Sequence, residues 1–276
     1  PVSKVVKITQ RISEGDYDTR FQEDICAKEL HELAHAVNQM AESLEEQETM
    51  RKRLTSDVAH ELRTPVANVS SYMEMMTDGI VEPTPERLQK CYDELQRLSG
   101  LIDDLERLRQ IENENLVLDK SDVDLLELAQ TVMENFELKF REKHLTGQVT
   151  GDAAIVPIDR DRMQQVITNL VSNAIKYSND GGTVRVVIKD TEDSGMIHVE
   201  DSGIGIPQED LKRIFERFYR VDKARSRQAG GTGLGLSIVH DMAERHFGTI
   251  EVAHRDPVGT RFQVTFPLFA VEEEPE

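Results

Sequence analysis

Glycine is distributed very unevenly along this chain of 276 residues, and that distribution constrains the fold more than any other feature. The first 115 residues contain three of the 16 glycines, at positions 15, 79 and 100. A stretch that is poor in glycine can form long uninterrupted helices, whereas turns and phosphate-binding loops need glycine. We therefore expect a helical front part and a back part that contains strands and turns.

The front part places apolar residues at helical spacing in three segments. Val5, Ile8 and Ile12 predict a short amphipathic helix that ends at Gly15, followed by a connector from residue 16 to about residue 28. Two long stripes with the three-and-four spacing of coiled coils follow, separated by residues 78–85. They comprise Leu30, Leu33, Val37, Met40, Leu44, Leu54, Val58, Leu62, Val66, Val69, Met73 and Met76, and then Leu88, Tyr92, Leu95, Leu98, Ile102, Leu105 and Leu108.

The two long stripes predict a pair of helices that form an antiparallel hairpin. Thr84 is a suitable N-cap for the second helix, and Pro85 is suited to its first position. A lone hairpin leaves part of its apolar surface in water, and a second copy covers that surface. We therefore expect a homodimer in which two hairpins form a four-helix bundle.

In the back part, the spacing of apolar residues changes, and segments typical of strands occur beside segments typical of helices. This pattern predicts an α/β layer domain. Helices are expected from about residue 160 to 176 and from 234 to about 246. Strands are expected at 145–150, 153–158, 183–189, 196–199, 249–253 and 261–266.

Charge and composition exclude several classes of protein. The chain carries 52 acidic and 33 basic side chains, a formal charge of −19, so we expect no nucleic-acid partner. No apolar run approaches the ~20 residues that cross a bilayer, and we expect the chain as given to be soluble. The two cysteines, Cys26 and Cys91, lack metal-ligand spacing and are interpreted as packing residues in a reducing compartment.

A histidine and a proline stand close together within the first long stripe. His60 lies two positions from Val58 and from Leu62, so on a helix it points away from the apolar stripe and should face solvent. Pro65 cannot donate to the carbonyl of residue 61, which predicts a bend beside His60. The alternative interpretation is an ordinary solvated histidine, against which the neighbouring Glu61 and Thr64 argue.

Two asparagines and a lysine share one face of the predicted helix at 160–176. Asn169, Asn173 and Lys176 are spaced by four and three residues. An amide oxygen can ligate Mg²⁺, and a lysine can pair with phosphates. A plain polar helix face is the alternative.

Two glycine-rich segments and a basic segment complete the pattern. Residues 201–207, Asp-Ser-Gly-Ile-Gly-Ile-Pro, follow a strand, and the carboxylate of Asp201 can accept a hydrogen bond from an adenine amino group, although a simple turn has the same pattern. Residues 230–236 precede an apolar helix and offer backbone amides to an anion. Arg217, Arg220, Lys223, Arg225 and Arg227 indicate either a mobile basic lid over a triphosphate or a solvated loop.

In combination and in order, these segments resemble the sensor histidine kinases of two-component systems. His60 to Pro65 are similar to the phosphoacceptor box of that family, and residues 1–47 resemble a HAMP linker, although Ala27 to Leu30 depart from the usual entry to its second helix. The other boxes are matched by Asn169, Asn173, Lys176 and Tyr177 (N box), Asp201 to Gly205 (first glycine box), Phe215 and Phe218 (phenylalanine box), Gly231, Gly233 and Gly235 (second glycine box), and Gly259 with Thr260.

The resemblance implies a multidomain architecture: a HAMP-like coiled coil at 1–47, a dimerisation and phosphotransfer hairpin at 48–115, an ATP-binding α/β sandwich of the gyrase and histidine-kinase type at 116–270, and an acidic tail at 271–276. It implies ATP and Mg²⁺ as cofactors, with Asn173 on the metal. Catalytic roles fall to His60, Glu61, Thr64, Asn169 and Lys176. Nucleotide binding falls to Asn173, Tyr177, Asp201, Gly203, Gly205, Gly231, Thr232, Gly233, Leu234, Gly235 and Thr260.

The resemblance also implies a reaction and its partners. ATP phosphorylates His60, the phosphoryl group passes to an aspartate in the receiver domain of a response regulator, and Thr64 orients water in the reverse phosphatase reaction. Because HAMP segments normally follow a membrane helix, the chain is expected to be the cytoplasmic region of a bacterial cell-membrane sensor. Two rivals are weighed: a gyrase-type clamp ATPase has no need of His60 to Pro65, and a pseudokinase scaffold has no need of the complete set of boxes.

Overall fold

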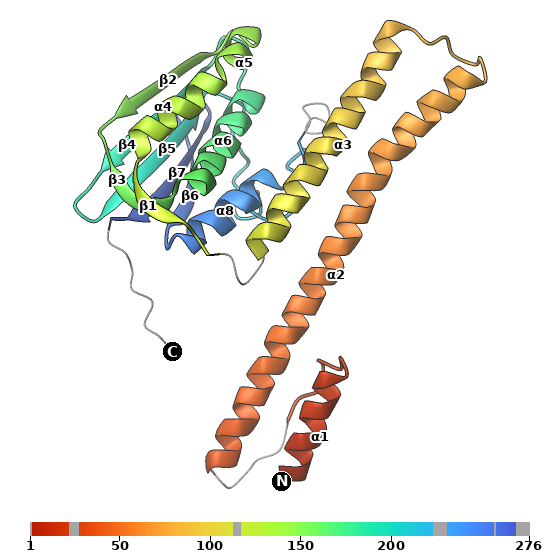
Figure 1. The fold of residues 1–276 in the computed structure, drawn as a ribbon, viewed down its shortest axis with the longest axis vertical. Coiled ribbons are helices and arrows are strands. Elements are labelled where there is room, and N and C mark those ends of the chain that lie inside the picture. The colour runs from red at the N-terminus through yellow and green to blue at the C-terminus, as the bar shows by residue number, and fades with distance from the viewer. Residues whose placement is uncertain (1, 22–27, 113–116, 223–230, 257, 269–276) are drawn as a thin grey trace. The chain divides into compact units, whose positions relative to one another are not determined.

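The computed structural model describes residues 2–21, 28–112, 117–222, 231–256 and 258–268, and it forms two compact units, Pro1–Glu82 and Pro83–Glu276 (Figure 1). Several sequence predictions lie outside the described residues. They concern Cys26 and the end of the connector at 22–27, the basic residues Lys223, Arg225 and Arg227 together with Gly230, and the acidic tail at 271–276.

The first unit contains helix α1 (Val2–Ser13) and helix α2 (Lys28–Thr77). Their apolar faces form a core of Val5, Ile12, Val37 and Ala41. The connector is fastened to α2 because the side chain of Asn38 accepts from the backbone N–H of Phe21 at 2.8 Å and donates to its carbonyl at 3.0 Å. The two predicted helices are therefore confirmed, and the described part of the connector ends at Phe21.

Helix α2 continues for 50 residues and passes through Pro65 without interruption. His60 is exposed, as its spacing predicts, and Pro65 is buried. The hydroxyl of Thr64 donates to the carbonyl of His60 at 3.2 Å, one turn earlier. Pro65 therefore does not end the helix, and the bend expected beside it stays a prediction. Among the described ranges, none of the helices combines the length and apolarity that a bilayer crossing requires.

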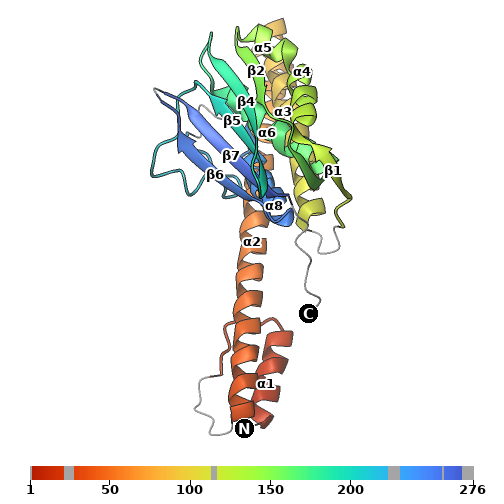
Figure 2. The same ribbon diagram turned by 90° about the vertical axis from the view of Figure 1, so that its left-hand side faces the viewer.

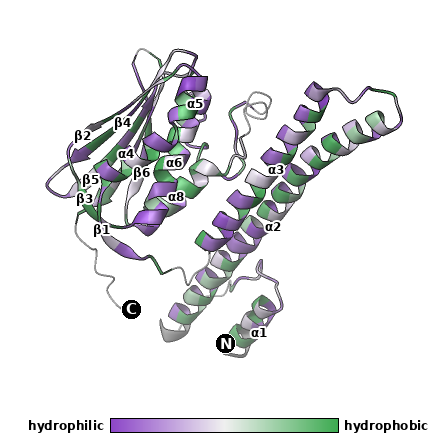
Figure 3. Cartoon of the chain, turned by 45° about the horizontal axis from the view of Figure 1, so that its top comes forward, coloured by the Kyte–Doolittle hydropathy of each residue, from purple (hydrophilic) through white to green (hydrophobic). Residues whose placement is uncertain are grey.

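The second unit begins with helix α3 (Pro85–Glu112), which starts at the proline that the sequence predicts. The carbonyl of Thr84 accepts from the amides of Arg87 and Leu88. Hydrophilic and hydrophobic residues alternate along the helix (Figure 3). Within the predicted stripe, four residues are exposed (Leu88, Tyr92, Leu95 and Ile102), whereas Leu101, Leu108 and Ile111 are buried. Helix α3 thus has a second apolar face, which the sequence analysis overlooked except at Leu108.

A five-stranded sheet forms the body of the second unit, in the order β2-β4-β5-β7-β6. Only β2 and β4 run parallel among these neighbours, and the other pairs are antiparallel. The strands are β2 (Thr146–Gly151), β4 (Thr183–Asp190), β5 (Ser194–Asp201), β6 (Thr249–His254) and β7 (Thr260–Pro267). Strands β1 (Lys120–Asp124) and β3 (Ile155–Asp159) pair separately.

Helices α4 (Leu125–Asn135), α6 (Arg160–Tyr177) and α8 (Gly235–Arg245) pack on one face of the sheet (Figure 2). The short helix α5 (Glu137–Glu142) follows α4. Their buried side chains and those of β4, β5 and β7 form the core, including Leu128, Met163, Leu170, Ile188, Ile197 and Phe266. The expected α/β domain is confirmed, but β1, α4 and α5 were not predicted.

Candidate functional site

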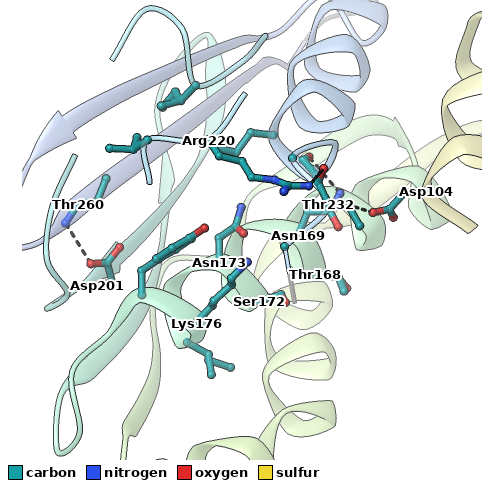
Figure 4. A pocket seen from close by; sticks show the side chains of 18 of the residues that line it. Asp104, Thr168, Asn169, Ser172, Asn173, Lys176, Asp201, Arg220, Thr232 and Thr260 are labelled. Atoms are coloured by element: carbon teal, nitrogen blue, oxygen red, sulfur yellow. Dashed lines mark hydrogen bonds between the residues drawn. The ribbon is translucent and has the colours of Figure 1, made fainter. Parts of the chain in front are cut away.

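A cavity of about 810 Å³ lies in the second unit, between α3, α6, the segment that leads into α8, and the ends of β5 and β7 (Figure 4). Figure 4 shows Asp201 and Thr260 toward one end and Thr232 with Asp104 toward the other. Most of the residues predicted to bind nucleotide line it, namely Asn173, Tyr177, Asp201, Gly205, Gly231, Thr232, Gly233, Gly235 and Thr260, and so do two predicted catalytic residues, Asn169 and Lys176.

Helix α6 supplies one wall, and its start is fixed by hydrogen bonds. Asp159 caps it, accepting from the amide of Arg162 at 3.1 Å. The amide of Asp159 donates to Nε2 of His246 at 3.1 Å, and Nδ1 of His246 lies 2.8 Å from the carbonyl of Met242. Burial lowers the pKa of His246, which favours the neutral ring that these two contacts require. The beginning of α6 is thereby tied to the end of α8.

The predicted polar face of α6 is directed toward the cavity. Asn169 donates from Nδ2 to the carbonyl of Gly235 at 3.3 Å, which links α6 to the start of α8. At the other end, Nζ of Lys143 donates to the carbonyls of Ile175 and Lys176 at 2.9 and 3.0 Å. Such bonds satisfy carbonyls that a helix end leaves without partners. Asn169, Asn173 and Lys176 therefore lie on one face of a helix that is held in place at both ends.

Lys176 lies in a positive part of the cavity. Burial, together with Arg220, Arg97 and Lys143, lowers its pKa to about 8. An anion placed here gains both from the ammonium and from these guanidinium groups. The cavity wall is therefore locally cationic in a chain of net charge −19.

Asp201 ends β5 at the opposite end of the cavity and is 5% exposed. Its Oδ1 accepts from the amides of Gly203 at 2.8 Å and Thr260 at 3.2 Å. Burial raises its pKa, and these hydrogen bonds oppose that effect. Gly259 permits the arrangement, because a Cβ there would lie 2.0 Å from the carbonyl oxygen of Asp201 and its φ is +134°.

The segment before α8 forms a hydrogen-bonded loop at the cationic end. Arg220 donates to the carbonyl of Thr232 at 2.8 Å, and the Thr232 hydroxyl accepts from the amide of Leu234 at 3.3 Å. Gly233 has φ +80° and accepts from the amide of Phe218 at 2.9 Å. The loop thus presents its backbone at the N-terminus of α8, which favours an anion.

The structure does not bring every predicted residue to the cavity. Gly203 donates its amide to Asp201 but is absent from the wall, and Leu234 is fully buried in the core. His60, Glu61 and Thr64 belong to α2 in the first unit. Arg217 of the predicted basic lid pairs instead with Asp241 of α8 at 3.4 Å.

Helix α3 also contributes to the cavity, which was not predicted from the sequence. Six of its residues line the wall: Gln96, Arg97, Gly100, Asp103, Asp104 and Arg107. The side chain of Asp104 accepts a hydrogen bond from the Thr232 hydroxyl at 2.7 Å. A signal was present, because Asp104 falls between Leu101 and Leu108 at the spacing of an apolar stripe.

The donors and acceptors of the cavity fit a nucleotide with a divalent cation. A buried carboxylate at one end matches a base that carries an amino group, and the cationic end with its glycine-rich loop matches phosphates. The amide of Asn173 offers an oxygen of the kind that Mg²⁺ prefers. A cavity of about 810 Å³ accommodates a ligand of this size.

Comparison with known families identifies three consecutive regions. The family of histidine kinase-, DNA gyrase B- and HSP90-like ATPases matches residues 158–270. The His Kinase A phosphoacceptor domain matches residues 50–114, and the HAMP domain matches residues 1–46.

Individual relatives are similar over most of the chain. The signal transduction histidine-protein kinase BaeS of Escherichia coli is 35% identical over 97% of this chain, which spans 57% of that relative. The sensor histidine kinase WalK of Bacillus subtilis is 35% identical over 83% of this chain, which spans 39% of it. The chain thus spans 57% of the length of the first relative and 39% of the length of the second.

Solved structures share the fold. Histidine kinase AdeS of Acinetobacter baumannii superimposes with a TM-score of 0.63 at 28% identity, covering 76% of this chain and 98% of the solved AdeS chain. The catalytic domain of histidine kinase ThkA is 31% identical with a TM-score of 0.50, covering 55% of this chain and 97% of that domain. With the boxes in order along the chain, these likenesses show that it belongs to the sensor histidine kinases of two-component signal transduction.

Proposed function

We propose that this chain transfers the terminal phosphoryl group of ATP to His60 and then to an aspartate of a response regulator. The observation that carries the proposal is the cavity, which gathers a buried carboxylate, an amide and lysine face, and a glycine-rich loop. The phosphoacceptor is supported by the exposure of His60 within the region that matches the phosphoacceptor domain.

The nucleotide would bind with its base at Asp201 and its phosphates at the cationic end. One oxygen of Asp201 is engaged by two backbone amides, which orients the carboxylate toward an amino group of the base. Lys176 and Arg220 would neutralise phosphate charge. Phosphoryl transfer depends mainly on such positioning and neutralisation.

Asn173 would hold Mg²⁺ through its amide oxygen. The ion, when bound, supplies positive charge that offsets the charge on the phosphate oxygens. Asn169, which is fastened to the carbonyl of Gly235, would keep α6 and the glycine-rich loop in register around the phosphates.

In the transfer itself, one nitrogen of a neutral His60 imidazole attacks the terminal phosphorus. A bond forms between that nitrogen and phosphorus while the bond to the bridging oxygen breaks, and ADP leaves with the electron pair. Glu61 would accept a hydrogen bond from the other ring nitrogen and stabilise the positive charge that develops. These roles rest on the resemblance of His60 to Pro65 to the phosphoacceptor box.

A response regulator is the proposed partner, and dephosphorylation of that regulator is a second proposed activity. A solved structure holds histidine kinase ThkA in complex with the response regulator TrrA, with a TM-score of 0.68 to this chain at 27% identity. Thr64 lies one turn from His60 and would orient water in the reverse reaction.

We further propose a homodimer that is anchored to the bacterial cell membrane by a segment outside this sequence. Leu88, Tyr92, Leu95 and Ile102 are exposed on α3 and support pairing with a second hairpin. A monomer in sedimentation at micromolar concentration would contradict the dimer.

The HAMP match supports the anchored, cytoplasmic placement, which fractionation of cells that express the full-length protein would test.

Substitution of the proposed acceptor should separate labelling from binding. His60→Gln is expected to abolish incorporation of label from γ-labelled ATP, because the nucleophile is gone, and to leave ATP affinity unchanged. The matched control is His35→Gln, which alters another exposed histidine of α2 and should label like the parent chain. Persistent acid-labile label in His60→Gln would place the acceptor elsewhere.

Substitution of the proposed metal ligand should remove the effect of Mg²⁺ on binding. Asn173→Ala is expected to weaken Mg-ATP binding about 10-fold or more, because an oxygen ligand is lost. Isothermal titration with and without Mg²⁺ checks this, and an affinity that still rises with Mg²⁺ as in the parent chain would refute the ligand role.

The phosphatase proposal is tested at Thr64. Thr64→Ala should leave labelling of His60 intact and slow dephosphorylation of a labelled regulator, because the hydroxyl that orients water is removed. Thr55→Ala is the matched control, since Thr55 is also exposed on α2 and donates to the carbonyl one turn earlier, at 2.9 Å. Equal dephosphorylation rates in both variants would count against the role.

ATP affinity should fall as the pH rises above about 8. Because the pKa of Lys176 is lowered to about 8, its ammonium is present below that pH and is lost above it, and phosphate binding favours the charged form. Affinity measured between pH 7 and 9.5 should decline by up to ~10-fold per pH unit in the parent chain. Lys176→Arg, which stays protonated, should flatten this profile; an unchanged slope would exclude Lys176 as its source.

A further inference from the structure

Asp104 is a carboxylate on the buried face of α3. Leu101, Leu108 and Ile111 are at most 4% exposed, and Asp104 stands three residues after the first and four before the second. Its side chain is 18% exposed. A charged group at such a position is costly unless it has partners. Its partners therefore indicate what the position does.

The partner inside the cavity is the glycine-rich loop. Asp104 Oδ2 accepts from the Thr232 hydroxyl at 2.7 Å (Figure 4). Its Oδ1 lies 3.5 Å from a guanidinium nitrogen of Arg107. The same Thr232 hydroxyl accepts from the amide of Leu234, the residue before α8, at 3.3 Å. The carboxylate thus lies where the loop would otherwise offer a donor to an anionic ligand.

The hydrogen bond between Asp104 and Thr232 lies in a buried and positively charged part of the cavity. Arg220 is bonded to the carbonyl of Thr232, and Lys176 lies close enough to Arg220 and Arg97 for their charges to lower its pKa. An anion in this region is attracted by several cations. Burial raises the pKa of Asp104, which the Thr232 and Arg107 contacts oppose. A phosphate oxygen at this position could accept from the Thr232 hydroxyl and would be attracted by the same cations as the Asp104 carboxylate.

We propose that Asp104 is an autoinhibitory residue that occupies, at Thr232, the position of a substrate phosphate oxygen. Docking of α3 on the cavity and binding of the triphosphate then compete for one hydroxyl. Because such competition is reciprocal, a nucleotide with a full set of phosphates releases α3, and a signal that withdraws α3 raises nucleotide affinity. This inference rests on the proposed nucleotide-binding function.

An opposite role for the same contact makes the opposite prediction. If Asp104 instead positioned Thr232 for nucleotide binding, removal of the carboxylate would weaken binding. If Asp104 excludes phosphate, removal of its charge strengthens binding, and the gain grows with the number of phosphates. The sign of the change therefore distinguishes the two roles.

The experiment measures the affinity of the whole chain for adenosine, ADP and ATP in Mg²⁺, by competition with a fluorescent nucleotide. The variants are Asp104→Asn, which keeps the shape and removes the charge, and Asp104→Ala, which also removes the acceptor. Asp93→Asn is the control, because it makes the same charge change at an exposed position of α3 that is not part of the cavity wall. Unfolding temperatures establish that each variant is folded.

We expect Asp104→Asn and Asp104→Ala to raise ATP affinity roughly 5-fold or more, to raise ADP affinity less, and to leave adenosine affinity unchanged. Asp93→Asn should match the parent chain for all three ligands. Unchanged or weakened ATP binding, or an equal gain for adenosine and ATP, overturns the inference while the proposed function stands. If the parent chain and Asp93→Asn bind no nucleotide, the proposed function and the inference both fail.

Discussion

The rotational setting of α6 is the constraint on which the cavity depends. Seven buried side chains fix the helix against the sheet, so that its remaining face can turn in one direction only. Asp159 with His246 fixes its start, and Lys143 fixes its end. A slip of one residue would rotate the face by about 100° and carry Asn173 away from the wall. Apolar packing therefore determines the chemistry of a polar surface.

Electrostatics in the second unit are local and run against the overall charge. The chain is acidic, yet one end of the cavity is lined by cationic side chains from α3, α6 and the segment that contains Arg220. At the other end, the carboxylate of Asp201 is buried and accepts hydrogen bonds from two backbone amides. The cavity thus has a hydrogen-bond acceptor at one end and cationic groups at the other. This arrangement would orient a ligand that carries a hydrogen-bond donor at one end and an anionic group at the other.

Much of this arrangement could be predicted from the sequence, for a definite reason. Periods of 3.6 and 2 residues located most elements, and motif spacing located Asn169, Asn173, Lys176 and Asp201 on the wall, because these are local signals. Contacts between elements distant in sequence have no such signal. The bond between Asp104 and Thr232 joins residues 128 positions apart. Leu234 was assigned to nucleotide binding by resemblance to the second glycine box, and its side chain packs in the core.

The connector is fastened to α2 at Asn38, and the helix continues from there to His60 without a break. His60 lies 22 positions after Asn38, a distance of roughly 33 Å along the helix at about 1.5 Å per residue. Because the helix is continuous over this length, the number of residues between Asn38 and His60 fixes the angle between their side chains around the helix axis. An insertion of seven residues between them would change this angle by only about 20°, whereas an insertion of one residue would turn the proposed acceptor by about 100°.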